Sequence, residues 1–333
     1  MKTLAEYQQL VEAEIKKQFF DKKTQPKELF EPIEYILEEG GKRLRPALCV
    51  LACHLFSEQI AQAVKPAVAL ETFHNFTLLH DDIMDKADMR RGRATVHKKW
   101  NENTAILSGD AMVILAYQLL EEIDSKYLSQ VLKIFNQTSL DVCIGQQYDM
   151  NFELRPLGTQ TEAVSESEYL YMISKKTSVL IAASLQIGAI LGGAKASDAQ
   201  NLYDFGENLG IAFQLQDDLL DVYGNEAEFG KKIGGDILAN KKTFLLIKAY
   251  ELLHSKEQLN EMIYFLPQSE KEKQYKILKV TEIYNSLEIK ELTEQKILFF
   301  YHKALQALDT IEIEEFKKKI LKDFAMNLLN RKK

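Results

Sequence analysis

Apolar residues recur at helical spacing along most of this 333-residue chain. Leu115, Leu119 and Ile123 follow this pattern, and the segment from Leu245 to Leu253 follows it again. The alternation of apolar and polar residues that marks a half-buried strand is scarce, and only six prolines interrupt the chain. We therefore expect an all-α protein without a sheet.

The chain carries no low-complexity linker that would divide it. Glycine pairs at 40–41 and 192–193, Gly92, and the glycine-containing stretch 224–235 separate segments long enough for helices of three to six turns. Residues beyond about Lys248 are richer in lysine and glutamate, so we expect solvated helices packed outside the core there. The simplest organisation is a single helical domain over residues 1–333.

Composition excludes several classes of protein. The net charge of -7 argues against a general nucleic-acid binder. Cys49, Cys53 and Cys143 are too few and too scattered for a disulfide framework, and Cys49 and Cys53 are expected to be small buried side chains. The longest charge-free run, 177–194, contains glycine, serine and glutamine, which favours a buried core helix over a membrane span. No secretory signal is apparent, so we expect a cytoplasmic protein.

Two aspartate clusters share one spacing. The first reads Asp-Asp-Ile-Met-Asp over 81–85, and the second reads Asp-Asp-Leu-Leu-Asp over 217–221. On a helix, residues four apart lie on one face, so each cluster presents two carboxylates side by side. A single cluster of this kind would be taken for a solvated acidic face. Two copies, each following an apolar segment, favour metal binding.

The donor types indicate which metal. Hard carboxylate oxygens without a nearby histidine or cysteine ligand favour Mg²⁺ over zinc. Magnesium is usually held by one or two carboxylates, with water and substrate phosphate completing the shell. The sequence therefore indicates a diphosphate or a similar polyanion as substrate.

Basic residues lie near both clusters. They occur in the segment 40–46, at 90–93, at 175–176, at 231–232 and at 241–242. Arginine and lysine are the side chains that bind phosphate oxygens. Each pair alone would be ordinary surface charge, and its place beside the aspartates is what makes it informative.

Together these motifs resemble the trans-isoprenyl diphosphate synthases, the family of farnesyl and geranylgeranyl diphosphate synthases. The resemblance runs from about residue 30 to residue 250, with the motifs in the family's order. It is carried by the segment 41–46, the region 71–91, the stretch 145–149, Lys176-Thr177 and the region 213–218. It implies a bundle of about ten helices around a deep central cavity, the isoprenoid synthase type, which is usually a homodimer.

The resemblance also implies roles for individual residues. Asp81, Asp85, Asp217 and Asp221 would bind up to three Mg²⁺ ions. The allylic diphosphate would be held with the help of Arg90, Lys176, Lys231 and Lys241, with Lys232 left as an alternative to Lys231. Isopentenyl diphosphate would be held by Lys42, Arg45, His74 and Arg91. Gln214 and the backbone at Lys176 and Thr177 would face the developing carbocation.

Residues upstream of the first cluster bear on product length. Phe76 lies five residues before Asp81 and Phe73 lies eight before it, so both can face the pocket for the growing tail. An aromatic residue at 76 followed by a small one, Thr77, resembles the short-chain geranylgeranyl synthases. We expect a product of twenty carbons, with fifteen as the alternative. The competing interpretation is that both phenylalanines only pack the core.

The expected chemistry is ionisation of the allylic diphosphate, attack by the double bond of isopentenyl diphosphate, and loss of a proton. It needs no protein nucleophile, and the sequence shows no Ser-His-Asp or Cys-His arrangement. Two other hypotheses stay open. A related enzyme would cyclise one diphosphate or join two allylic tails, with little use for Lys42, Arg45 and Arg91. A helical scaffold would carry the same charges as solvated faces.

Overall fold

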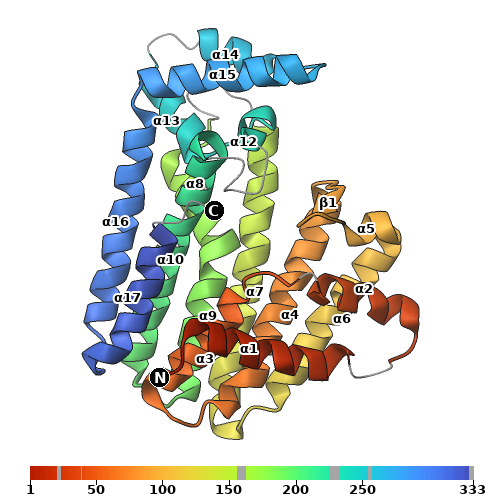
Figure 1. The fold of residues 1–333 in the computed structure, drawn as a ribbon, viewed down its shortest axis with the longest axis vertical. Helices are drawn as coiled ribbons and strands as arrows, with labels where there is room; N and C mark the ends of the chain where they lie inside the picture. The colour runs from red at the N-terminus through yellow and green to blue at the C-terminus, as the bar shows by residue number, and fades with distance from the viewer. Residues whose placement is uncertain (21–23, 39, 156–162, 225–232, 254–256, 330–333) are drawn as a thin grey trace. The chain divides into compact units, whose positions relative to one another are not determined.

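The computed structural model describes residues 1–333 except 21–23, 39, 156–162, 225–232, 254–256 and 330–333. The described residues are helical almost throughout (Figure 1), which confirms the predicted all-α class. They form two compact units: unit 1 comprises Met1–Gln137, Leu180–Tyr203 and Ile311–Ile320, and unit 2 comprises Thr138–Val179, Asp204–Thr310 and Leu321–Lys333. Helices α7 (Ser125–Leu154), α10 (Ala196–Tyr223) and α17 (Glu315–Leu329) contribute to both. The single domain stays a prediction.

Unit 1 is built around helix α4 (Ala61–Met84), which packs along α3 (Leu44–Phe56) and α6 (Glu102–Glu121). Cys49 and Cys53 of α3 are fully buried, as expected. The other elements of this unit are α1 (Leu4–Ile15), the π-helical turn η1 (Lys16–Phe20), α2 (Lys27–Glu38), α5 (Val96–Lys99) and most of α9 (Val179–Leu191).

A short β-ribbon follows α4, so the expectation of no sheet is wrong at this point. Strand β1 (Met89–Arg90) pairs antiparallel with β2 (Arg93–Ala94), with Arg90 opposite Arg93. Arg91 and Gly92 between them have φ angles of 49° and 80°. Positive φ at both central residues is typical of the type I′ turn, whose twist suits a two-residue hairpin. Strands of two residues are too short to leave an alternating pattern in the sequence.

Unit 2 contains a large buried apolar cluster. Its helices are α8 (Glu166–Ile173), the π-helical turn η2 (Ser174–Ser178), α12 (Gly235–Leu238), α13 (Phe244–Leu252), α14 (Glu257–Tyr264), α15 (Glu270–Ser286) and α16 (Ile289–Asp309), with parts of α7, α10 and α17. The cluster joins Leu215 and Leu219 of α10 to Val280 and Tyr284 of α15 and to Ile297 of α16. The expectation that the C-terminal helices pack outside the core is therefore wrong for α15 and α16.

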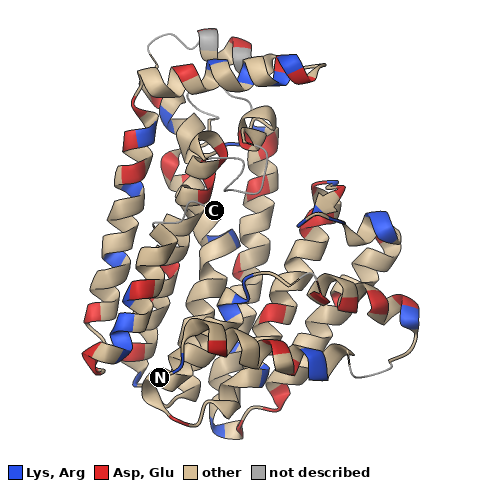
Figure 2. Ribbon diagram, in the orientation of Figure 1, with Lys and Arg blue, Asp and Glu red and all other residues tan. Residues whose placement is uncertain are grey.

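Most charged residues of those helices lie on one face, and Lys276 of α15 is buried. Figure 2 shows acidic and basic residues interspersed along α16, and Thr293, Ile297 and Ala304 of the same helix are buried. Helix α15 runs across the end of α16 (Figure 1), with α14 packed against it. A lysine- and glutamate-rich sequence is compatible with core packing because one apolar face in each helix suffices.

Candidate active site

The first aspartate cluster ends helix α4. Asp82 is 3% exposed, because it shares the buried helix face with Asn75 and Leu79. Arg90 Nε donates to both carboxylate oxygens of Asp82 at 2.9 Å, and Nη2 lies 2.8 Å from Oδ1. Asp81 is partly exposed and Asp85 is exposed. The middle aspartate is thus bound by an arginine, while the outer two lie on a more open face.

The hairpin after α4 brings Arg91 to the glycine-rich loop. Arg91 Nη1 donates to the Gly40 carbonyl oxygen at 2.9 Å. Gly41 has a φ of 102°, and a Cβ there would lie 2.8 Å from Arg91 Nη1. Only glycine suits this position, because a side chain would be strained and would displace the guanidinium. The predicted isopentenyl diphosphate residue Arg91 and the predicted loop are therefore in direct contact.

The loop's cations take different positions. Arg43 is buried and binds Glu71 at 2.8 Å and Glu12 at 2.9 Å, so it is structural. Arg45 Nη1 lies 3.1 Å from His74 Nε2. Arg45 Nε is buried and has no hydrogen-bond partner among the described residues. Lys42 is exposed. An unsatisfied buried guanidinium donor beside a histidine is suited to an anionic ligand.

His74 is neutral in this environment. Burial, followed by the guanidinium of Arg45, lowers the pKa of His74 well below its ordinary value of 6.5. Arg91 and Arg90 lower that pKa further. The unprotonated Nε2 accepts from Arg45, since guanidinium is only a donor. The structure thus brings together three of the four residues predicted to hold isopentenyl diphosphate, Arg45, His74 and Arg91.

The two phenylalanines upstream of the cluster belong to an aromatic group within unit 1. Phe73 is buried, with its ring centroid 5.4 Å from Phe76 and 5.4 Å from Phe135. Phe135 in turn packs edge-on against Tyr117 at 5.2 Å. Phe76 is only partly buried and contacts His80 at 4.7 Å. Thr77 is partly buried, and its hydroxyl donates to the His74 carbonyl oxygen at 2.8 Å.

The second cluster on α10 repeats the arrangement of the first. Asp218 is buried because it lies in helical phase with Ile211, Leu215 and Val222. Tyr169 donates to Asp218 Oδ2 at 2.5 Å, and Gln214 Nε2 donates to Oδ1 at 3.0 Å. Burial raises the pKa of Asp218 to about 7. Asp217 and Asp221 are partly exposed, and Asp221 Oδ2 accepts from the backbone N–H of Asp236 at 2.9 Å.

Lys176 and Thr177 lie in the π-helical turn η2. Lys176 Nζ donates to Asp149 Oδ2 at 2.5 Å, and Thr177 Oγ1 donates to Gln214 Oε1 at 3.3 Å. A Cβ on Gly145 of α7 would lie 2.2 Å from the Lys176 nitrogen. The absence of a side chain at Gly145 therefore allows the backbone of η2 to pack against α7. Asp149, one turn later on α7, binds Lys176. π-Helical turns of this kind are common at functional sites.

Lys241 follows the short helix α12. Its N–H donates to the Asp236 carbonyl oxygen at 2.9 Å, and its Nζ lies 4.0 Å from Asp236 Oδ1. Lys231 and Lys232, the other predicted phosphate-binding lysines, lie outside the described residues.

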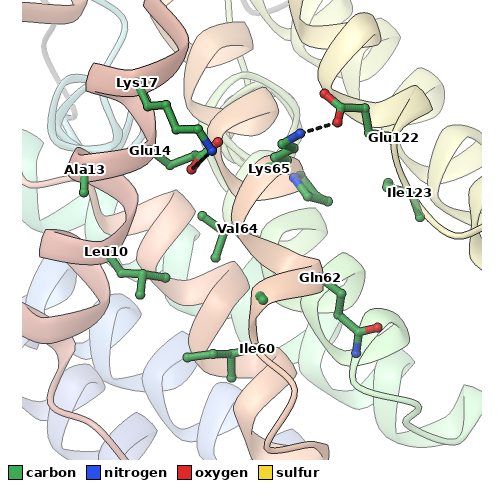
Figure 3. Close-up of a pocket in the computed structure, with 12 residues that line it drawn as sticks. Leu10, Ala13, Glu14, Lys17, Ile60, Gln62, Val64, Lys65, Glu122 and Ile123 are labelled. Atoms are coloured by element: carbon green, nitrogen blue, oxygen red, sulfur yellow. Dashed lines mark hydrogen bonds and ion pairs between the residues drawn. The ribbon is translucent and has the colours of Figure 1, made fainter. Parts of the chain in front are cut away.

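Two cavities of very different size are relevant. A cavity of about 40 Å³ in unit 2 is lined by residues of the site just described, among them Lys176, Thr177, Gln214, Asp218 and Lys241. A pocket of about 570 Å³ in unit 1 lies between α1, the start of α4 and the end of α6 (Figure 3), with Leu10, Val64 and Ile123 in its lining. The larger pocket is at the opposite end of α4 from Asp81. We assign the chemistry to the aspartate clusters, because volume alone does not supply reactive groups.

The carboxylates fit magnesium rather than zinc. Among the described residues, no group of three or more histidine, cysteine, aspartate or glutamate side chains could hold a metal ion by itself. Asp217 and Asp221 lie four residues apart on α10, and Asp81 on α4 lies four residues before Asp85, the C-cap of that helix, so each pair could supply two carboxylates. Such a donor set suits a cation that keeps waters and binds substrate phosphate.

Four residues at the site were not predicted as functional: Asp82, Asp149, Tyr169 and Asp218. The helical phase of Asp82 and Asp218 within their own apolar faces could have identified them as buried. No pattern in the sequence pairs Tyr169 with Asp218, because they are 49 residues apart. Asp149 belongs to the stretch 145–149 that carries the family resemblance, yet its partner Lys176 is 27 residues away.

Comparisons with known proteins identify the family of the chain. The profile of the polyprenyl synthetase family matches residues 26–283. The chain is 44% identical over 231 residues to a geranylgeranyl diphosphate synthase of Methanosarcina mazei, covering 68% of this chain and 69% of that protein. It is 42% identical over 234 residues to the geranylgeranyl diphosphate synthase of Sulfolobus acidocaldarius, covering 69% of each.

Solved structures give the same result. The crystal structure of a geranylgeranyl pyrophosphate synthase matches 100% of both chains with a TM-score of 0.94 and 42% identity. A geranylgeranyl pyrophosphate synthetase from Geoglobus acetivorans matches with a TM-score of 0.85 and 33% identity, covering 99% of this chain and 100% of that one. The fold and these relatives define a trans-prenyltransferase of the all-helical isoprenoid synthase fold. The chain belongs to the polyprenyl synthetase family.

Proposed function

We propose that this enzyme condenses isopentenyl diphosphate with an allylic diphosphate in a magnesium-dependent reaction. The observation that carries the proposal is that both clusters divide their aspartates in the same way. The middle residue, Asp82 or Asp218, is buried and bound by neighbouring side chains. The outer carboxylates lie on the more exposed side of each helix. We assign the binding of Mg²⁺, up to three ions in all, to these outer carboxylates of Asp81, Asp85, Asp217 and Asp221.

When bound, magnesium would neutralise the negative charge that develops on the departing diphosphate. The protein would add Arg90, Lys176 and Lys241, together with Lys231 or Lys232. Arg90 and Lys176 are paired with Asp82 and Asp149. These carboxylates orient the two cations, because a paired side chain has less rotational freedom.

The second substrate would be recognised in unit 1. Arg45, with an unsatisfied Nε and a neutral His74 as neighbour, would bind the diphosphate of isopentenyl diphosphate, together with Lys42 and Arg91. A second diphosphate site favours chain elongation over the cyclisation of a single diphosphate.

Gln214 would stabilise the allylic carbocation. Its side-chain amide donates to Asp218, which turns the carbonyl oxygen Oε1 toward the Thr177 hydroxyl. An oxygen dipole held in this way stabilises positive charge without reorganising during the reaction. The double bond of isopentenyl diphosphate attacks the cation, and the released diphosphate takes the proton that is lost.

We infer a twenty-carbon product, with fifteen carbons as the alternative. The inference rests on Phe73, Phe76 and Thr77, and on the geranylgeranyl diphosphate synthases among the relatives. The deep central cavity that the tail would occupy stays a prediction.

The proposed homodimer is supported by helix α6. One face of α6 is buried, whereas Ile106 and Leu107 are 44% and 60% exposed and Ile114 is 60% exposed. By length and composition alone, α6 is also the one helix of the described ranges that is apolar enough to cross a membrane. Length and composition are weak evidence for a membrane span, because the core helix of a soluble protein meets the same criteria. We favour a dimer contact of a cytoplasmic enzyme; analytical ultracentrifugation of Ile114→Lys, with loss of the dimer as the expected result, checks it.

The reaction itself is tested by incubating the protein with Mg²⁺, radiolabelled isopentenyl diphosphate and dimethylallyl, geranyl or farnesyl diphosphate in turn. Products are dephosphorylated and sized by chromatography. A labelled prenol of one length, abolished by EDTA, is expected. A folded protein that yields no labelled prenol with any starter would refute condensation and favour a cyclase or a scaffold.

A further inference from the structure

Lys276 on helix α15 is fully buried, with an exposed fraction of 0%. Other lysines of this helix lie at the surface and pair with nearby glutamates, for example Lys279 with Glu282 at 2.7 Å. No carboxylate of the described residues contacts Lys276. Burying an ammonium group without a counter-ion is costly unless its donors are all bonded. A position on the apolar face of α15 would be filled more stably by leucine or methionine, so the lysine calls for an explanation.

The donors of Lys276 converge on one turn. Its Nζ lies 2.8 Å from Asn240 Oδ1, 3.2 Å from the Phe265 carbonyl oxygen and 3.4 Å from the Ile263 carbonyl oxygen. Three oxygen acceptors match the three N–H groups of a protonated lysine. Two of the acceptors belong to the end of α14, and the third belongs to the turn after α12.

That turn is a Schellman motif. Asn240 has a left-handed φ of 52°, its N–H donates to the Ile237 carbonyl oxygen, and the Lys241 N–H donates to that of Asp236. These are the two bonds that end a helix in this motif, with Asn240 at the left-handed position. Lys276 holds the Asn240 side chain, and so fixes the residue on which the geometry of the turn depends.

The turn connects two groups of the candidate active site. At one end, the Asp236 N–H donates to Asp221 Oδ2 at 2.9 Å. At the other end is Lys241, which lines the small cavity together with Lys176 and Gln214. A displacement of Asn240 would therefore move Lys241 and Asp236 together.

We propose that Lys276 is a positioning residue for prenyl transfer, which acts through Asn240 to hold Lys241 and the Asp236–Asp221 contact in place for the allylic diphosphate. This rests on the proposed function, in which Lys241 binds that diphosphate. It also assigns helices α14 and α15 a role: they supply the carbonyl oxygens and the lysine that secure the turn.

The test is a comparison of kinetic constants for the two diphosphate substrates. Lys276→Met keeps the length and apolar stem of the side chain and removes its donors. We expect its KM for the allylic diphosphate, and its Ki for inorganic pyrophosphate, to rise about tenfold or more. KM for isopentenyl diphosphate should stay within about twofold of the native value, because the residues predicted to bind that substrate lie in unit 1. Lys279→Met, at a half-exposed position one turn along, is the matched control and should change none of these three constants.

Asn240→Gly supplies a second, independent variant. Glycine keeps the left-handed backbone and removes only Oδ1. Its effect on the allylic KM should equal that of Lys276→Met, and the double variant should be no worse than either single one, because both remove the same bond. If Lys276→Met does not fold, Asn240→Gly carries the test alone. An unchanged allylic KM, or equal rises in KM for both substrates, would overturn the proposal.

Failure of the proposed function gives a different result. In that case the unaltered protein forms no prenol from any allylic starter. The positioning role fails instead when the unaltered protein is active and both variants keep its ratio of KM values.

Discussion

The Tyr169 hydroxyl donates to Asp218 across 2.5 Å, and both groups are buried in unit 2. Gln214 donates to the other oxygen of the same carboxylate. Asp218 therefore links the second aspartate cluster to the side chain proposed to face the carbocation.

Tyr169→Phe removes one of these two donors. We expect the free energy of unfolding to fall by about 1–3 kcal/mol, the usual effect of leaving a buried polar group without a partner. We also expect kcat to fall while KM changes less, because Gln214 loses its fixed orientation. Urea titration and steady-state kinetics measure the two effects. Tyr171→Phe, at a position that is 45% exposed, is the control; equal effects of the two variants would contradict the role given to Tyr169.

Substitutions within the first cluster should separate metal binding from stability. Asp85→Asn should lower kcat about 100-fold or more, since charge stabilisation in the transition state is lost, and should raise the Mg²⁺ concentration needed for half-maximal activity. Its melting temperature in EDTA should not change. Asp82→Asn should instead weaken the buried contact with Arg90, and lower the free energy of unfolding by about 1–3 kcal/mol. A loss of stability in Asp85→Asn as large as that in Asp82→Asn would show that the two carboxylates are not divided as proposed.

The pKa of His74 leads to a pH dependence of stability. Because that pKa is well below 6.5 in the folded protein, the unfolded chain binds more protons below pH 6.5. The free energy of unfolding should therefore fall as the pH drops below about 6.5, with a slope of at most about 1.4 kcal/mol per pH unit from this group. Urea titrations from pH 5 to 8 measure the slope. His74→Gln, which keeps an oxygen acceptor for Arg45, should flatten it, whereas the exposed His302→Gln should not. Parallel curves for the native protein and His74→Gln would contradict the assignment.

Much of the site follows from the sequence because helical spacing determines which residues share a face. In the structure Asp217 and Asp221 lie four residues apart on α10, whereas Asp81 lies on α4 and Asp85 is the C-cap of that helix. The same phase argument places Asp82 and Asp218 on the buried faces, but it names no partner for them. Arg90 reaches Asp82 through a hairpin of two-residue strands that leaves no periodic pattern.

Contacts between distant segments were the part that spacing could not predict. Lys276 looked like one more surface lysine in a charged helix, and its burial depends on how α14 and the turn at Asn240 pack around it. Gly145 belongs to the stretch 145–149, but the need for glycine there comes from the backbone of Lys176, 31 positions further along the chain.

Gly145→Ala tests that close approach. A Cβ 2.2 Å from the Lys176 nitrogen must displace η2. We expect a loss of about 1–3 kcal/mol in the free energy of unfolding, as for other overpacked cores, together with reduced kcat, because Lys176 and Thr177 move. The matched control is Cys143→Ala, two residues earlier on an exposed face of α7. Thermal melts measure the loss of stability, and activity assays measure kcat. Normal activity in Gly145→Ala would show that η2 tolerates the shift.

Phe76→Ala should lengthen the product. Phe76 is partly buried and packs on Phe73 at 5.4 Å, so its removal opens space next to the first cluster without emptying the core. Phe73→Ala is the weaker test, since truncating a buried phenylalanine costs about 3–5 kcal/mol. We expect products one or more five-carbon units longer than those of the native enzyme, at similar stability.

Chromatography of the dephosphorylated products measures their length directly. Phe316→Ala, at a position that is 59% exposed, serves as the control and should leave product length unchanged. If Phe76→Ala makes the same product as the native enzyme, the two phenylalanines only pack the core, and another part of the chain sets the length. A longer product would instead place the end of the tail at this aromatic group, because the added isoprene units need the volume that the ring had filled.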